Sequence, residues 1–186
     1  AFRPTGAAGG IEELIKAGLT VEQVINGGLE ASLNLAVAGN LQLAEAAEIA
    51  STALNSFKAD GLSAADAANI LAGAANASAT DVQELRYGLS MSSAVASGIG
   101  LSFRDTATAL ATFAQNGLKG SDAGTSLKTM LLNLSPSTEA ASEQMAELGL
   151  LTAQGTSAIY DANGSIRSMA EIAELLQTKL ANLSDG

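Results

Sequence analysis

The chain has 186 residues, enough for one domain with a sizeable core, and it contains no Cys, His or Trp. This composition excludes disulfide frameworks, Cys/His metal or haem sites, and catalytic couples of Ser or Cys with His within the segment. The formal net charge is −10, and the nine Lys and Arg residues are scattered singly, which argues against nucleic acid as a partner.

Glycine-containing junctions recur at intervals of about 40 residues, a period typical of helix-pair repeats. In each junction Gly can end one helix in the left-handed conformation, and the following Thr or Ser can cap the next helix. Three residues after the cap, Gln or Asp can complete a capping box. The junctions are Gly18-Leu19-Thr20 with Gln23, Gly61-Leu62-Ser63 with Asp66, and Gly100-Leu101-Ser102 with Asp105.

Three further helix starts are predicted from capping residues. Thr80 with Gln83 and Ser168 with Glu171 repeat the capping box. Ser135 before Pro136 places proline in a first helical turn, where its missing amide costs nothing.

Apolar residues between these starts follow helical spacing rather than alternation. Residues 64–79 are rich in Ala and Gly, so we expect a thin helix that can lie close to two neighbours at once. The other predicted buried stripes are Leu43, Ala47, Ala50, Leu54 and Phe57; Phe103, Ala107, Leu110 and Ala114; Ala123, Leu127, Met130 and Leu134; and Met169, Ile172, Leu176, Leu180 and Leu183.

One segment near residues 157–167 departs from the helical pattern. Residues 158–160 and 165–167 read as short strands, and Asn163-Gly164 between them supplies residues that tolerate positive φ. We predict a small β-hairpin whose Ile159, Tyr160 or Ile166 packs onto a helix, because an isolated two-stranded ribbon is marginal in water.

The predicted fold is all-α, a bundle of seven to nine helices in antiparallel pairs with this one hairpin. Residues 1–40 are assigned as N-terminal flanking helices and residues 41–186 as the core helical domain, packed together as one domain. No apolar stretch approaches the roughly 20 residues of a membrane span. The start has neither an initiator Met nor a signal peptide, so we interpret the chain as a piece of something longer.

Candidate catalytic and binding motifs in the chain are incomplete. Asp161, Asn163 and Gly164 suggest a calcium loop, but Ser165 and Ile172 stand where its fifth and twelfth positions fall. Residues 98–103 carry only half of a phosphate-loop pattern, and residues 88–92 lack the second Gly of a nucleophile elbow. We therefore assign no cofactor-binding or metal-binding residue.

Paired carboxylates occur at Glu12 and Glu13, Glu45 and Glu48, and Glu171 and Glu174, each on the polar side of a predicted helix. A catalytic acid needs burial or a charged neighbour to shift its pKa. We therefore nominate no catalytic residue. A hydrolase built on such a pair would require a cleft holding two carboxylates of raised pKa.

Residues 100–131 read GLSFRDTATALATFAQNGLKGSDAGTSLKTML. In order they hold a Gly-Leu-Ser junction, a helix ending in Ala-Gln-Asn-Gly, a Gly-Ser junction and a helix opening Ala-Gly-Thr-Ser-Leu. This order resembles the conserved core of phage tail tape-measure proteins. The resemblance extends over about residues 45–186, through residues 134–141, the aspartate-glycine turn at 160–167 and the helix after it.

The resemblance implies a non-enzymatic structural segment from a phage or prophage. Tape-measure proteins are long helical chains that occupy the lumen of the growing tail tube and set its length with tail assembly chaperones. The implied partners are the tail tube protein and these chaperones, and the implied locations are the virion tail lumen and, during assembly, the host cytoplasm. Small-residue helix faces would also permit self-association. The alternative is a helical binding module of a bacterial surface or secreted protein.

Overall fold

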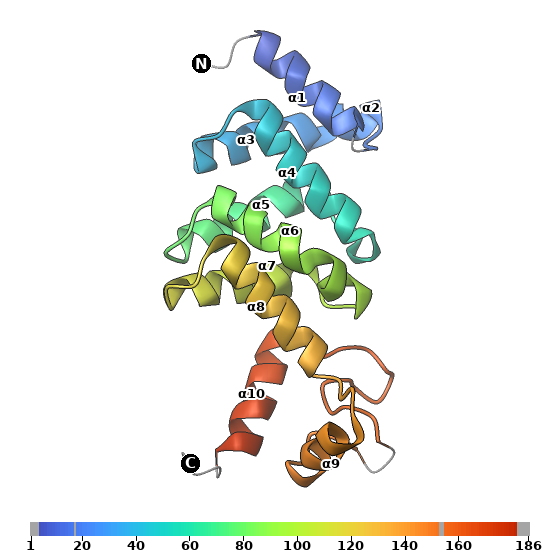
Figure 1. Ribbon diagram of the computed structural model, residues 1–186. Helices are drawn as coiled ribbons and strands as arrows, with labels where there is room; N and C mark the ends of the chain where they lie inside the picture. Colours follow the sequence, from blue (N-terminus) through green and yellow to red (C-terminus); the bar gives the residue numbers. More distant parts are fainter. Residues whose placement is uncertain (1–3, 17, 153–154, 182–186) are drawn as a thin grey trace.

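The computed structural model describes residues 4–16, 18–152 and 155–181 (Figure 1). The predicted all-α class is confirmed. The elements are α1 (Pro4–Lys16), α2 (Val21–Gln23), the π-helical turn η1 (Val24–Gly28), α3 (Leu29–Gly39), α4 (Leu43–Ser56), the 3₁₀ turn η2 (Lys58–Asp60), α5 (Ala64–Asn76), α6 (Val82–Gly98), α7 (Phe103–Gln115), α8 (Gly120–Asn133), α9 (Glu139–Glu147) and α10 (Met169–Leu180).

The helices alternate between two rows that form an elongated stack (Figure 1). One row consists of α1, α4, α6 and α8, and the other of α3, α5 and α7, with α10 against α7. Each junction of the 40-residue pattern leads from the first row to the second. The sequence period is therefore one helix pair, which packs on the pair before it and the pair after it.

The three junctions have the conformation that their residues predict. Gly18, Gly61 and Gly100 have φ of 93°, 64° and 85°. At the third, the amide of Leu101 donates to the Ala96 carbonyl at 2.9 Å, which closes α6 with a Schellman motif. Thr20 and Ser63 make complete capping boxes with Gln23 and Asp66, and Ser102 accepts from the Asp105 amide.

Two predicted helix starts are displaced. The N-cap of α6 is Asp81 rather than Thr80, and it accepts from the Glu84 amide at 2.8 Å. The helix α9 begins three residues after Pro136, where Thr138 accepts from the Ala141 amide at 3.1 Å. At the first start, Asp is a stronger N-cap than Thr. At the second, the helix is capped by Thr138 and not by Ser135. The box of Ser168 with Glu171 is confirmed.

The predicted β-hairpin is wrong: the described residues contain no strand, only isolated antiparallel bridges at Leu151 with Ser157 and at Tyr160 with Ile166. The turn itself forms, and Gly164 has φ of 80°. Asp161 Oδ1 accepts from the amides of Asn163 and Ser165 at 2.8 and 2.9 Å, so these amides turn inward to the carboxylate. At the turn end the Ser165 amide is taken by this carboxylate, and at the other end the Ser168 amide binds Glu171 Oε2, so the pairing stays a single bridge.

A continuous apolar core runs from α3 to α10. At its centre the rings of Phe57 and Phe103 lie 5.3 Å apart between centroids at an angle of 54°. The predicted stripes of α4 and α7 are buried except for half-buried Leu54. In α10 only Ile172 is buried among the described residues, Leu180 is exposed, and Leu183 lies outside them.

Two glycines determine how closely the helices approach. Gly88 of α6 faces Gly124 of α8, and a Cβ built on Gly124 would lie 2.8 Å from Gly88 Cα and overlap its carbonyl oxygen. The two backbones are thus in direct contact. The Ala-rich α5 lies between α3 and α7, as its small side chains predict.

Candidate functional site

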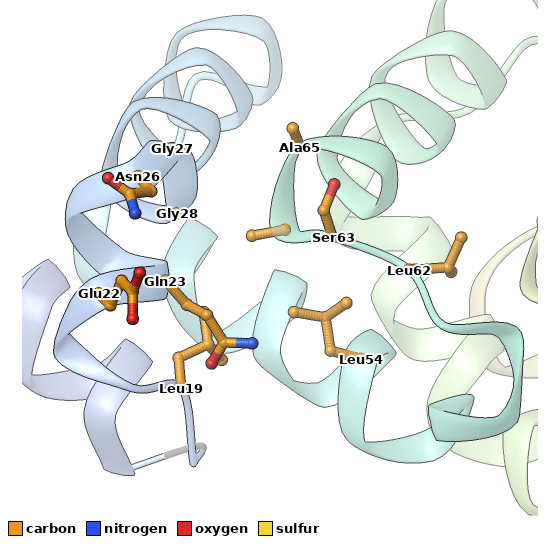
Figure 2. Close-up of a pocket in the computed structure, with 11 residues that line it drawn as sticks. Leu19, Glu22, Gln23, Asn26, Gly27, Gly28, Leu54, Leu62, Ser63 and Ala65 are labelled. Atoms are coloured by element: carbon orange, nitrogen blue, oxygen red, sulfur yellow. The ribbon is translucent and has the colours of Figure 1, made fainter.

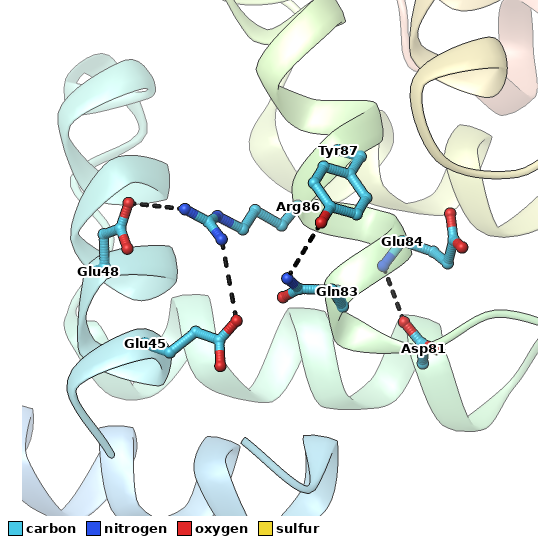
Figure 3. A network of polar contacts seen from close by, with 7 residues as sticks. All are labelled: Glu45, Glu48, Asp81, Gln83, Glu84, Arg86 and Tyr87. Carbon is cyan, nitrogen blue, oxygen red and sulfur yellow. Dashed lines mark hydrogen bonds and ion pairs between the residues drawn. The ribbon is translucent and has the colours of Figure 1, made fainter. Parts of the chain in front are cut away.

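In each carboxylate pair at least one side chain forms an ion pair or caps a helix N-terminus. Figure 3 shows that Glu45 and Glu48 of α4 both point to Arg86 of α6. Arg86 Nη2 lies 2.8 Å from Glu48 Oε1, and Nη1 lies 3.9 Å from Glu45 Oε1. This pair therefore joins two consecutive helices of the first row rather than lining a reaction cleft.

The other two pairs are also engaged. Lys16 Nζ lies 2.9 Å from Glu12 Oε1 and 3.1 Å from Glu13 Oε1 on the exposed side of α1. Glu171 Oε2 accepts from the Ser168 amide and hydroxyl at 2.9 and 2.7 Å, so it is the capping residue of α10. Glu12 and Glu171 therefore each make a structural contact within their own helix or at its N-terminus.

The pKa shifts in the described carboxyl groups run downward. The hydrogen bond from Lys16 lowers the pKa of Glu12, and the Ser63 hydroxyl lowers the pKa of Asp66. Hydrogen bonds from the Ser165 amide and the Ser168 hydroxyl lower the pKa of Asp161 and of Glu171. A general acid needs the opposite shift, so these four carboxyl groups are unsuited to that role.

The described residues contain no cluster of three or more His, Cys, Asp or Glu side chains that could hold a metal ion. The suggested calcium loop is a turn in which the Asp161 carboxylate is occupied by backbone amides. The glycines at 98–100 belong to the Schellman end of α6, not to a phosphate loop. None of the helices in the described part of the chain combines the length and apolar character that a membrane crossing needs.

A pocket of 280 Å³ lies between η1 and the start of α5 (Figure 2). It exists because the backbone leaves helical conformation at Asn26, with ψ of 33°, and at Gly27, with φ of 123°. Ser63 lines the pocket, but its hydroxyl donates to Asp66 in the capping box at 2.6 Å. The larger apolar side chains are Leu19, Leu54 and Leu62, beside Ala64 and Ala65, and the other polar ones are Glu22, Gln23 and Asn26. The Ser63 hydroxyl thus acts in the capping box of α5.

A second, apolar groove of 450 Å³ lies at the N-terminal end of the stack, on α1, α2, η1 and α3. The sequence predicted neither the pocket nor the groove. The signal for the pocket was the run Asn26-Gly27-Gly28, which cannot hold a regular helix well. The signal for the groove was Val21 and Ile25, large residues at junction positions where the next repeat has Ala64 and Ala68.

The stack, its helix-pair period and its small-residue contacts agree with a structural protein of repeated units. Across its full length, residues 1–186, the chain matches the family described as phage-related minor tail protein. The chain belongs to this family. As a phage minor tail protein it has a structural role in the phage tail, in agreement with the resemblance that residues 100–131 show.

Similarity to a second phage protein supports the assignment of this chain to the minor tail protein family. The tape measure protein of Pneumococcus phage Dp-1 is 30% identical to this chain over 184 residues, which cover 99% of this chain and 15% of that protein. The chain thus spans about 15% of the length of this relative. No solved structure matches.

Proposed function

We propose that this chain is a structural segment of a tail tape measure, with a part in tail assembly and in setting tail length. The observation that carries the proposal is the 30% identity with a tape measure protein over nearly the whole chain. The two-row stack supports it, because its length grows with the number of helix pairs. The alternative, a surface or secreted binding module, has no comparable support.

The proposal includes a place and partners. The segment would lie in the lumen of the tail tube in the virion and in the host cytoplasm during assembly. There it would contact the tail tube protein and tail assembly chaperones, with self-association as a further contact. The uncharged faces of Ala, Ser and Thr on this chain, of which only 15% is charged, suit close packing against a tube wall or another copy.

The decisive experiment changes the number of helix pairs in the intact gene of the phage or prophage. Residues 61–99 run from one junction to the next, so extra copies can be inserted with the junction residues preserved. Four extra copies should lengthen the tails, measured by electron microscopy. The gain would be about 40 Å if the pairs stack as here, and roughly 230 Å if they extend as one helix.

Two controls make the outcome interpretable. Circular dichroism of the lengthened segment tests whether the added pairs fold. Gly73→Ala, at an exposed helical position with nothing within 4 Å of a new Cβ, changes no length and should leave the tails unchanged. Intact virions with normal tail length, despite four added pairs, would refute the role in length determination.

A further inference from the structure

The first helices of the stack leave one apolar face uncovered. The groove of 450 Å³ is bounded by apolar side chains from α1, α2, η1 and α3, namely Ile11, Ile15, Val21, Ile25, Leu29 and Leu33. Ile15, Val21 and Ile25 are 45%, 60% and 75% exposed. Clustered exposed residues of this size typically mark a binding surface rather than a solvated one.

The junction register shows what covers this face elsewhere in the same chain. Val21 directly follows the cap Thr20, as Ala64 follows Ser63 and Phe103 follows Ser102. Val21 is 60% exposed, whereas Ala64 and Phe103 are 7% and 0% exposed.

The same comparison holds four residues further along. Ile25 is 75% exposed, whereas its counterparts Ala68 and Ala107 are 3% and 0% exposed. The position before it, Val24, is buried like its counterpart Ala67, so the buried positions keep the same register into the start of η1. The difference is the neighbour: α3 packs on α5, and α5 packs on α7, while α2 and η1 begin their row.

From this register we propose that the groove is the docking face for one more helix pair of the same stack, contributed by chain that precedes residue 1 in the full-length protein. The helix that enters the groove would present small or medium apolar residues, as α3 does to α5. Glu30 lines the groove, so a basic residue is expected opposite it on the incoming pair.

Charge and shape favour this occupant over a second copy of the chain. Two copies joined groove to groove would bring Glu30 of both chains together, and each chain carries a formal charge of −10. A head-to-tail contact would require a matching open end at the last helix pair, but α10 packs on α7, and Ser157 donates to the Leu134 carbonyl just after α8.

The test compares two lengths of the protein with and without the apolar groove side chains. Val21→Gln with Ile25→Gln is made in residues 1–186 and in the full-length protein. In residues 1–186 the melting temperature should not fall, because both side chains are exposed. In the longer chain it should fall by about 4–8 °C, and amide exchange in the preceding pair should accelerate.

A matched control and two contrary outcomes complete the test. Val37→Gln on α3, 70% exposed and outside the groove, should change neither chain. An unchanged melting temperature of the longer double variant, or a reading frame that begins at residue 1, would overturn the proposal. Sedimentation of residues 1–186 as a dimer that Ile25→Gln dissociates would replace it with self-association. If the proposed role in tail length fails its own test, the docking proposal still stands, because the stacking of helix pairs does not depend on that role.

Discussion

Gly124 determines the distance between α6 and α8, because its missing side chain lets the α8 backbone touch the backbone at Gly88. A methyl group at Gly124 has no flexible neighbour to displace, so the helices themselves must separate. We expect Gly124→Ala to lower the free energy of unfolding by about 1–3 kcal/mol, the usual range for overpacking. Urea unfolding followed by circular dichroism measures the change.

The same substitution at Gly73 is the matched control and should have the opposite sign. Gly73 lies inside α5, and a Cβ built there meets nothing within 4 Å. Because Ala is favoured over Gly in a helix by about 1 kcal/mol, Gly73→Ala should stabilise the protein. If both substitutions changed the free energy of unfolding equally, then helix propensity, and not the backbone contact, would determine the effect at Gly124.

Residue-scale prediction from the sequence succeeded where a side chain acts within its own turn. Ser63 with Asp66, and Gly100 at the end of α6, follow from local hydrogen bonding alone. The contact of Gly88 with Gly124 could not be predicted in this way. Neither glycine belongs to a predicted buried stripe, and only the order of helices in the row makes them face each other.

At the scale of the element, the helix starts couple stability to pH. Hydrogen bonds from Ser63 and Ser168 lower the pKa of Asp66 below its ordinary 3.8 and that of Glu171 below 4.5. Below these ordinary values the unfolded chain binds more protons than the folded chain. The caps therefore stabilise the fold fully above about pH 4.5, and their contribution is lost as the pH falls through the lowered values.

Removal of the titrating groups should reduce this dependence. Glu171→Gln keeps a side chain that completes a capping box but does not titrate, and Asp66→Asn also removes a charge. We expect the double variant to lose less melting temperature than the parent between about pH 6 and pH 3. Thermal circular dichroism at both values measures the difference. Identical losses would show that other carboxylates carry the acid sensitivity.

Element prediction failed where a polar side chain competed with the backbone. Asn163-Gly164 correctly predicted a turn, but the carboxylate of Asp161 binds the amide of Ser165, which a strand ladder would need. At α6, two adjacent capping residues, Thr80 and Asp81, left the start ambiguous by one position. The π-helical turn at Val24–Gly28 has only the Gly pair as a local signal.

At the scale of the whole molecule, the period of the junctions predicted helix pairs but not their order in space. The rows arise because each pair buries its apolar stripes on the pair before and the pair after it. Hydrogen bonds between consecutive helix pairs join residues that are 43 and 38 positions apart, close to the period of the junctions. Asp60 Oδ2 accepts from the Phe103 amide at 2.6 Å, and Gln115 Nε2 donates to the Ala77 carbonyl at 2.9 Å. Such a stack can gain or lose pairs without a change of fold.

We expect residues 1–40 and 41–186 to unfold together, because α3 shares its apolar core with later helices. Leu35 of α3 is 1% exposed and belongs to the same apolar cluster as Phe57 and Leu127. Leu35→Ala should therefore cost about 2–5 kcal/mol and lower one common transition. Amide exchange should accelerate in α8 as well as in α3, because global unfolding exposes both.

Val37→Ala on the same helix removes an exposed side chain and should leave the transition and the exchange rates unchanged. The contrary result for Leu35→Ala is a split transition, with faster exchange confined to α1–α3. Residues 1–40 would then open as a separate unit, since nearest-neighbour coupling in a stack can be weaker than the stability of its pairs. A single shifted transition instead means that the contact of α3 with α4 and α5 is strong enough to make the stack cooperative from its first pair onward.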